Sequence, residues 1–243
     1  MKQNSMNWLI RTELLIGKKN ITKLKKAHVL VCGLGGVGAA AAEMLCRSGI
    51  GEMTIVDSDK IHSSNRNRQI PALISTEGMM KTEVMKQRLL DVNPKLKLVI
   101  NSNYIKDDKI TDVLSLAEYD YVIDAIDTLS PKIYLIYHCM RMKLRLISSL
   151  GSGGKFDPSR VKIADISDSY NCKLGYYLRK KIHKLGIYSG FKVVFSPEKV
   201  DNNAIEIIEN KKNKKSIVGT ISYMPVVFGC FIASQVIRDI IEE

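Results

Sequence analysis

The segment DSDKIHSSNRNRQI, residues 57–70, brings acidic, amide and guanidinium side chains together directly after the apolar run MTIVD. An acidic residue at the end of a second strand, here Asp57 with Asp59 close behind, can accept hydrogen bonds from ribose hydroxyls. Arg68 can bind phosphate oxygens in a bidentate fork, and the amide of Asn65 can orient a phosphate or a metal-bound water. The segment therefore favours binding of nucleotide phosphates over a merely solvated polar loop.

A glycine-rich turn, GLGGVG at residues 33–38, follows the apolar run AHVLVCG and precedes a helix that we expect at 39–48. Glycines at these spacings permit a tight turn and a close approach of phosphate to the amino end of that helix. With Asp57, such a turn would equally suit an NAD-dependent dehydrogenase. The donors at 65–69, which include Gln69, exceed what the diphosphate of a dinucleotide needs, so we favour a triphosphate. The glycines concerned are Gly33, Gly35, Gly36 and Gly38.

Three further side chains could complete such a site. Lys81, near the start of a predicted helix at 79–91, could reach the phosphates, although most lysines on helices are simply solvated. Asp124 and Asp127 end the apolar run YDYVIDAID, and ligands gather at the carboxyl ends of parallel strands. One or two carboxylates together with phosphate oxygens suit Mg²⁺. We expect Lys81 and Asp127 to lie outside the hydrophobic core.

The elements that must position these residues follow an alternating pattern. Apolar runs alternate with helix-period segments as far as LRLISSLGSGG, which predicts parallel βαβ units. Shorter strands, VKIADIS and FKVVFS, then flank a basic helical segment, LGYYLRKKIHKLG. The predicted fold is α/β: a Rossmann-like, mostly parallel sheet with helices on both faces, continued by an antiparallel C-terminal part. We expect one domain over 1–243, with a nucleotide-binding half at about 27–150 and a substrate-side half at about 151–243.

Composition narrows the classes of function. Lys and Arg number 37 against 25 Asp and Glu, and the resulting charge of +12 attracts polyanions such as nucleic acid, although an AT-rich genome also enriches lysine. The five cysteines form no C-x-x-C pair, so no structural zinc is expected. Polar residues interrupt YMPVVFGCFIASQVIRDII, which predicts a core helix from near Pro225 and no membrane span. With no secretory signal at the N-terminus, we expect a cytoplasmic protein.

The ordered set of motifs resembles the adenylating family of ubiquitin-activating-like enzymes, the ThiF/MoeB/HesA group. The set comprises G-x-G-G-x-G at 33–38, D-x-D at 57–59, N-R-N-R-Q at 65–69, Lys81 and D-A-I-D at 124–127. Enzymes of this group activate a carboxylate by its attack on the α-phosphate of ATP. The resemblance implies that Asp57 holds the ribose and that Asp127 binds Mg²⁺. It also assigns the triphosphate to Asn65, Arg68 and Lys81.

The same resemblance implies an arginine from an N-terminal segment, often supplied across a homodimer, and Arg11 in RTELLIG is its match. The implied catalytic residues are Arg11, Arg68, Lys81 and Asp127. ThiF and MoeB proteins usually carry paired C-x-x-C zinc ligands, which this sequence lacks. Cys172 lies where a catalytic cysteine could stand, but its neighbours DSYNCKLG match no nucleophile motif, and an incidental cysteine is the favoured interpretation.

Longer stretches resemble the tRNA-modifying branch of this family: RTELLIG, NRQIPAL, YVIDAIDTLSPK, LISSLGSGGKFDPSRVKIADIS and KVVFSPE. That branch uses ATP to adenylate the threonyl carboxylate of threonylcarbamoyladenosine beside the anticodon, and ring closure follows with net loss of water. The implied partners are tRNA and a second copy of the chain, with no membrane, and a sulfur-transfer partner is unknown. An enzyme that adenylates a ubiquitin-like sulfur carrier is the alternative, and a non-enzymatic nucleotide-binding module is a third hypothesis.

Two basic clusters in the C-terminal half agree with a tRNA substrate, because such clusters bind phosphates without reading bases. Each cluster taken alone is more often a solvated surface. The clusters comprise Arg179, Lys180, Lys181 and Lys184 on one predicted helix, and Lys211, Lys212, Lys214 and Lys215 in the polar segment 208–216.

Overall fold

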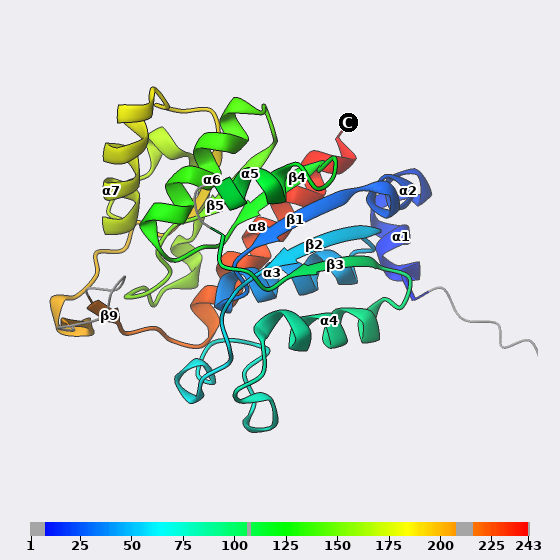
Figure 1. Cartoon of the computed structure of the whole chain (residues 1–243), viewed down its shortest axis with the longest axis horizontal. Helices are drawn as coiled ribbons and strands as arrows, with labels where there is room; N and C mark the ends of the chain where they lie inside the picture. The colour runs from blue at the N-terminus through cyan, green and yellow to red at the C-terminus, as the bar shows by residue number, and fades with distance from the viewer. Residues whose placement is uncertain (1–7, 106–107, 208–215, 243) are drawn as a thin grey trace, which may run out of the picture.

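A computed structural model describes residues 8–105, 108–207 and 216–242 and shows a seven-stranded sheet between helices (Figure 1). The strands of this sheet are β1 His28–Cys32, β2 Glu52–Val56, β3 Lys97–Asn101, β4 Tyr121–Asp124, β5 Leu146–Ser149, β6 Lys162–Asp165 and β7 Lys192–Phe195. Their order is β3-β2-β1-β4-β5-β7-β6, and every neighbouring pair is parallel except β6 and β7. A separate antiparallel pair is formed by β8 (Ile205–Ile207) and β9 (Ser216–Val218).

Helices cover both faces of the main sheet. The α-helices are α1 Ile10–Ile16, α2 Lys18–Lys26, α3 Gly36–Arg47, α4 Lys81–Val92, α5 Asp108–Leu114, α6 Leu129–Arg141, α7 Lys173–Ile182 and α8 Tyr223–Ile241. Helices α3, α4 and α8 share a hydrophobic core with one face of the sheet, whereas α5, α6 and α7 pack on the other face. This three-layer arrangement is visible in Figure 1.

The strands are short apolar runs because both faces of the sheet are buried. In β1, for example, Val31 packs in the core under α3 and α8, whereas Leu30 packs in the core under α5 and α6. The parallel register sets Cys32 opposite both Val56 and Asp124, the last residues of β2 and β4. The segments that were predicted to bind nucleotide therefore leave the sheet from one edge, the carboxyl edge.

The C-terminal helix α8 closes the fold. It buries Met224, Phe228 and Val236 in the core that it shares with α3. Among the described helices it is the one long and apolar enough to cross a membrane, but half of the 18-residue stretch concerned is buried inside the protein. The predicted core helix near Pro225 is confirmed, and its first residue is Tyr223.

The Rossmann-like, mostly parallel sheet with helices on both faces is confirmed. The antiparallel continuation is confirmed for the pairs β6–β7 and β8–β9, but β7 also runs parallel to β5 and so carries the main sheet into the C-terminal half. No helix was expected at α1, α2 or α5. Helix α2 buries only Ile21 and Leu24, and the other residues of this short helix are polar.

Candidate nucleotide-binding site

The glycine turn between β1 and α3 is enclosed on several sides. Gly33 adopts a φ of +93°, and a Cβ there would lie 2.7 Å from the carbonyl oxygen of Ala125, so a larger residue is excluded. A Cβ at Gly36 would lie 2.7 Å from Cβ of Pro225 and 2.8 Å from the carbonyl oxygen of Arg68. The loop after β4, the segment after β2 and the first turn of α8 therefore all meet at this turn.

The amino end of α3 opens into the same enclosure. Gly35 precedes the helix and provides no side-chain cap, and Gly38 belongs to the first turn, so the first N–H groups are available to an anion. Gln69 is buried, and its Nε2 lies 4.0 Å from the position that a Gly35 Cβ would take. Among the described residues, Gln69 Oε1 is the buried side-chain oxygen without a hydrogen-bond partner. A buried acceptor of this kind beside a helix amino end is typical of a site that a ligand completes.

Two aspartates and a lysine form an ion-pair network beside the turn. Lys81 Nζ lies 2.8 Å from Asp59 Oδ2 and 3.7 Å from Asp57 Oδ2. Asp57 also accepts hydrogen bonds from the backbone N–H groups of Leu34, at 2.6 Å, and of Asp59, at 2.8 Å. Burial raises the pKa of Asp57 and outweighs Lys81 and these N–H donors, which lower it. The network is open to solvent on one side, because the side chain of Asp59 is 66% exposed.

Lys81 lies outside the hydrophobic core, as expected, but it is buried rather than solvated. It is the first residue of α4 and is buried, and its charge is compensated by Asp57 and Asp59. The lysine does join the predicted acidic residues. Its burial means that its removal must affect stability as well as any role in binding.

The donor-rich segment that follows the acidic pair is folded on itself and attached to the C-terminal half. Asn65 Oδ1 accepts a hydrogen bond from the His62 N–H at 3.1 Å. Arg68 Nη1 donates to a backbone carbonyl and to Asn67 Oδ1, both at 2.8 Å. Asn67, for which no role was predicted, donates from Nδ2 to the carbonyl oxygen of Thr220 at 2.9 Å. This last contact ties the segment to the residues just before α8.

Asp124, predicted to bind ATP, is instead sealed inside the protein, and we correct its assignment. Its side chain and that of Lys132 are both 0% exposed, and Lys132 Nζ lies 2.6 Å from Asp124 Oδ2. Ser148 Oγ donates to the same oxygen at 2.6 Å, and Oδ1 accepts the N–H of Ile126. Asp124 therefore anchors the start of the loop that carries Asp127. It has no free oxygen directed at a nucleotide in this arrangement.

Lys132 was missed by the sequence analysis. Its signal was a single lysine within PKIYLIY, an otherwise apolar stretch of helix, where a charge needs a buried partner. Asp127, by contrast, is exposed at the carboxyl edge. It lies two residues beyond Ala125, whose carbonyl faces Gly33, so its place beside the glycine turn agrees with the prediction.

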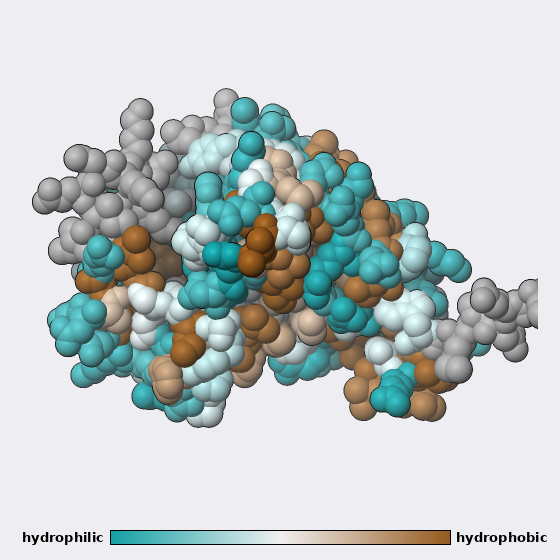
Figure 2. Space-filling model, turned by 90° about the horizontal axis from the view of Figure 1, so that it is seen from below, coloured by the Kyte–Doolittle hydropathy of each residue, from teal (hydrophilic) through white to brown (hydrophobic). Residues whose placement is uncertain are grey.

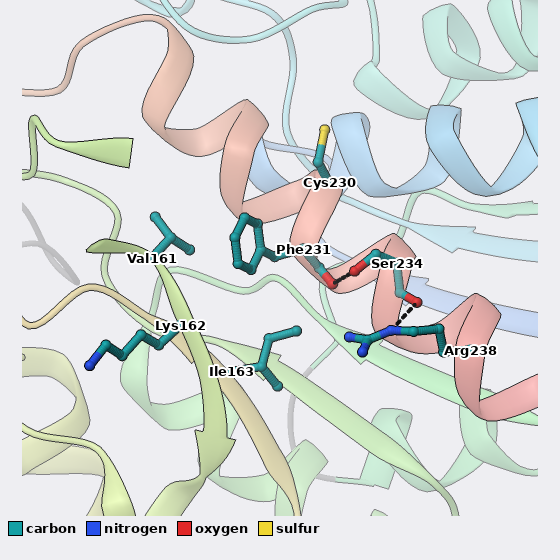
Figure 3. A pocket seen from close by; sticks show the side chains of 7 residues that line it. All are labelled: Val161, Lys162, Ile163, Cys230, Phe231, Ser234 and Arg238. Carbon is teal, nitrogen blue, oxygen red and sulfur yellow. Dashed lines mark hydrogen bonds between the residues drawn. The ribbon is translucent and has the colours of Figure 1, made fainter. Parts of the chain in front are cut away.

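Among the described residues, no three His, Cys, Asp or Glu side chains are grouped to bind a metal ion. A metal at the carboxyl edge would therefore need ligand oxygens from the nucleotide in addition to Asp127. A groove of about 590 Å³ lies elsewhere, between β6 and α8 (Figure 3). It is lined by apolar groups such as Ile163 and Phe231, and its Arg238 donates to the Ser234 carbonyl within α8. This groove contains no predicted site residue and no acidic group.

The surface around the site is mixed in character. The segment between β2 and α4 lies below the sheet in Figure 1, and Figure 2, seen from below, shows hydrophilic and hydrophobic residues interspersed over this face. Leu73 and Ile74 of the segment are 54% and 81% exposed.

Arg11 lies far from these residues within one chain. Helix α1, which carries it, leads through α2 into the amino end of β1, and Leu9 packs where a Cβ at Gly49, just before β2, would stand. The five residues of β1 separate that edge from the glycine turn by roughly 13 Å. Figure 1 shows α1 at one end of the molecule and α7 with β9 at the other. Arg11 therefore does not join the other predicted catalytic residues of its own chain.

The residues predicted to bind tRNA divide into three groups. Lys180, Lys181 and Lys184 are exposed on α7 and on the short turn that follows it. Arg179 is partly buried and donates to Ser169 Oγ, so its assignment to an open basic surface is corrected. The second cluster lies outside the described residues: Lys211, Lys212, Lys214 and Lys215.

The fold and the site together define an α/β protein whose glycine turn, acidic pair and buried lysine suit a nucleotide at the carboxyl edge of a parallel sheet. The chain belongs to the ThiF family, whose sequence pattern matches residues 9–243. It is 36% identical over 244 residues to the tRNA threonylcarbamoyladenosine dehydratase of Bacillus subtilis, and the match covers 96% of this chain and 94% of that protein.

Solved structures give the same picture. The crystal structure of Escherichia coli tRNA N6-threonylcarbamoyladenosine dehydratase in complex with ATP superimposes with a TM-score of 0.88 at 31% identity, over 96% of this chain and 93% of that chain. The same enzyme in complex with AMP gives a TM-score of 0.86 with the same identity and coverage. These likenesses extend over the nucleotide-binding half and the C-terminal half alike.

Proposed function

We propose that this chain catalyses the ATP-dependent dehydration of threonylcarbamoyladenosine in tRNA, in the cytoplasm. The threonyl carboxylate attacks the α-phosphate of ATP, which releases pyrophosphate and leaves an acyl-adenylate. An internal nucleophile of the same modified nucleoside then attacks the acyl carbon, closes the ring and releases AMP. Support comes from membership of the ThiF family and from the dehydratase of Bacillus subtilis, which is similar over nearly its whole length.

The single observation that carries the proposal is the open network of Asp57, Asp59 and Lys81 beside the enclosed glycine turn. Attack on a phosphate builds negative charge at phosphorus, and positioned cations that face this charge lower the barrier. Lys81 and Arg68 supply positive charge at this edge. Asp57 presents carboxylate oxygens, the acceptors that ribose hydroxyls require, and Gln69 Oε1 offers a further acceptor.

An acyl-adenylate is hydrolysed by water, so the site must also exclude solvent. Three segments already converge on the glycine turn: the loop after β4, the segment after β2 and the first turn of α8. The hydrogen bond from Asn67 to the Thr220 carbonyl holds two of them together. The C-terminal half thus acts as one wall of the nucleotide site and brings the tRNA side of the protein next to it.

Mg²⁺ fits this edge only together with the nucleotide. Asp127 is an exposed carboxylate at this edge and would hold the ion, with phosphate oxygens as further ligands. When bound, the ion would neutralise charge on the phosphates and on the pyrophosphate leaving group. Removal of Mg²⁺ by chelation is expected to abolish pyrophosphate release. A reaction that does not need the metal ion would continue at the same rate.

A homodimer is part of the proposal because Arg11 cannot serve the site of its own chain. Helix α1 exposes apolar side chains that its own fold leaves uncovered: Trp8 before it, and Ile10, Leu14 and Leu15 within it, are 49%, 44%, 80% and 84% exposed. A second copy that covers these side chains would lie next to Arg11, and Arg11 could then reach the site of that second copy. Sedimentation at micromolar concentration should show a dimer, and Leu14→Glu with Leu15→Glu should yield monomers with lowered activity.

Mass spectrometry of tRNA nucleosides tests the proposed reaction. After incubation with ATP and Mg²⁺, threonylcarbamoyladenosine should decrease and a product lighter by one water should appear in its place. A sulfur carrier that ends in Gly-Gly serves as the alternative substrate. If the carrier were adenylated and the tRNA nucleoside remained unchanged, the chain would belong with the carrier-activating members of its family instead.

A further inference from the structure

Exposed aromatic rings stand among the lysines of α7. We propose that this surface, defined by Tyr176, Tyr177, Lys180, Lys181, Lys184 and Tyr188 and called here the tyrosine–lysine surface, stacks on unpaired bases of the RNA loop that presents the substrate. The inference rests on the proposed function and adds to it a binding surface and a mode of recognition. The aromatic residues were not part of the predicted tRNA contact, which consisted of basic side chains alone.

The rings are more exposed than burial in a core would require. Tyr176, Tyr177 and Tyr188 are 55%, 45% and 63% exposed. They are held in pairs: the ring centroids of Tyr176 and Tyr177 lie 5.4 Å apart, and those of His183 and Tyr188 lie 5.0 Å apart. Tyrosine combines a flat apolar ring with a polar tip, which suits a wet interface. Two ring pairs therefore offer ready faces for stacking.

Helical spacing puts Tyr176, Tyr177, Lys180 and Lys181 on one side of α7, and Lys184 and Tyr188 follow in and after the short turn at its carboxyl end. Leu178 and Ile182 are buried in the core, whereas Tyr177, Lys181 and Lys184 follow one another at intervals of four and three residues on the exposed side. The stretch LGYYLRKKIHKLG contains no acidic residue, and within the described residues no ion pair involves its lysines. Cations for phosphates and rings for bases thus lie side by side.

This combination fits a single-stranded loop better than a duplex. Proteins recognise unpaired RNA by stacking bases on aromatic rings, whereas the bases of a duplex are already stacked and only its backbone is accessible to lysines. A surface that bound paired RNA would have no use for three exposed tyrosines. The chemistry therefore selects an RNA loop as the partner.

The position of α7 connects this surface to the nucleotide site. The amino end of the helix lies against the loop after β5: Cys172 Sγ is 3.8 Å from where a Cβ at Gly151 would stand, and Gly175 packs against Leu150. That loop leaves the same carboxyl edge as the loops after β1 and β4. From there α7 extends its ten residues, roughly 15 Å, away from the edge. Bases stacked along α7 would leave a neighbouring nucleotide free to enter the site.

Binding of two RNAs of equal length by fluorescence anisotropy tests the proposal: a stem-loop with an unpaired loop and a fully paired duplex. The double variant Tyr176→Ala with Tyr177→Ala should weaken binding of the stem-loop about 10-fold or more, with an unchanged salt slope and unchanged binding of the duplex. Tyr176→Phe with Tyr177→Phe keeps the rings and should bind as the wild type does. Equal loss for the stem-loop and the duplex, or no loss for either, would overturn the proposal.

The lysines are tested by their salt dependence. Lys180→Glu with Lys181→Glu should weaken binding of both RNAs and make the slope of affinity against salt shallower by about 1 to 2. The matched control is Lys25→Glu with Lys26→Glu, two exposed lysines on α2 near the amino end of β1, which should leave both affinities and the slope nearly unchanged. An equal effect of the two lysine pairs would mean that RNA responds only to the overall charge of the protein, and it would contradict the tyrosine–lysine surface.

Turnover separates this inference from the proposed function. In a wild type that dehydrates tRNA, the tyrosine-to-alanine variant should raise KM for tRNA about 10-fold and leave kcat within about 2-fold. An unchanged KM would overturn the stacking surface while the proposed function stands. If the wild type does not dehydrate tRNA yet the stem-loop binding still depends on the two rings, the proposed function falls and the RNA surface stands.

Discussion

Two of the buried lysines at the carboxyl edge of the sheet, Lys132 and Lys81, differ in the access of their partners to solvent. Lys132 and its partner Asp124 are both 0% exposed, and Ser148 completes their hydrogen bonds from β5. Lys81 is also buried, with a side chain 6% exposed, but one of its partners, Asp59, is 66% exposed. A sealed pair cannot exchange partners without leaving a charge unpaired in the interior, whereas an open network can turn toward a ligand.

The comparison assigns different work to two similar-looking pairs. The sealed pair anchors the end of β4 and the loop that leads to Asp127. The open network stands beside the glycine turn, where Asp57 reaches across to the Leu34 N–H. We infer that the sealed pair keeps the site in shape and that the open network contacts the nucleotide. Each of the following changes tests one side of this division.

Breaking the sealed pair should have the largest effect. Lys132→Met leaves the Asp124 carboxylate buried with no opposing charge, which should lower the free energy of unfolding by about 3 to 5 kcal/mol. Urea denaturation followed by circular dichroism measures it. The matched control is Lys97→Met, which breaks an exposed 2.7 Å pair with Glu52 and should cost less than about 1 kcal/mol. Equal losses in the two variants would remove the distinction.

Breaking the open network should lower stability less than breaking the sealed pair does, and it should lower activity more directly. Lys81→Met should lower the free energy of unfolding by about 1 to 3 kcal/mol, because Asp57 keeps two N–H donors and the Asp59 side chain is exposed to solvent. The loss of a cation that faces developing charge should slow pyrophosphate release by at least about 100-fold. A stable, fully active Lys81→Met protein would return this lysine to a purely structural role.

Acid should weaken ATP binding through Asp57. Because burial raises its pKa, the folded protein holds this proton more tightly than the unfolded chain. The contribution of Asp57 to stability is therefore largest below the unfolded pKa and is lost as pH rises to the folded pKa. The ionised carboxylate, which accepts hydrogen bonds from ribose hydroxyls, forms only above that raised pKa. The affinity for ATP should therefore begin to fall at a higher pH than it would if Asp57 were an exposed aspartate. Calorimetric titration with ATP at a series of pH values from neutral downward, compared with the matched variant below, measures this.

The matched variant for the pH experiment is Asp57→Asn, which removes the titrating group with little change in shape. Its affinity should be lower at neutral pH and much less dependent on pH. An identical pH profile in the wild type and the variant would show that another group, such as one of the phosphates, controls the response.

The smallest effect is expected for the link between the two halves. Asn67→Ala removes the hydrogen bond to the Thr220 carbonyl, an exposed contact, and should cost about 0.5 to 1.5 kcal/mol of stability. Because the wall of the site is loosened rather than removed, KM for ATP should rise only a few-fold. A loss as large as that of Lys81→Met would mean that closure of the C-terminal half controls the site.

The parallel sheet could be predicted because apolar runs alternate regularly with helical segments. The site could be predicted because its residues stand in distinct sequence motifs. The glycine turn, Asp57, Asp59, Lys81 and Asp127 all lie at one edge, as parallel strands require. The sequence could not show that Asp124 is sealed, since the partner that seals it, Lys132, comes from a helix and Ser148 from another strand. The family resemblance did imply that Arg11 can act across a homodimer, but its distance from the site of its own chain depends on how α1 and α2 fold back, which the sequence does not show.

Side-chain direction explains the remaining differences. Lys180 and Arg179 are neighbours in one basic run, yet one is exposed and the other bonds to Ser169, because successive helix residues point about 100° apart. From the sequence alone, the tyrosines of α7 could be core residues or surface residues, and only their exposure in the structure decides. A count of charges therefore identified the helix, and only the structure could show which of its side chains are exposed and so available to the proposed RNA.

Pyrophosphate release that depends on modified tRNA is the most direct test of the central claim that the carboxyl edge adenylates a carboxylate carried by tRNA. The wild type should release pyrophosphate from ATP and Mg²⁺ only when the tRNA contains threonylcarbamoyladenosine, and Asp127→Ala should reduce that release at least about 100-fold while remaining folded. Release that is independent of the modified nucleoside, or full activity of the Asp127→Ala protein, would contradict the account.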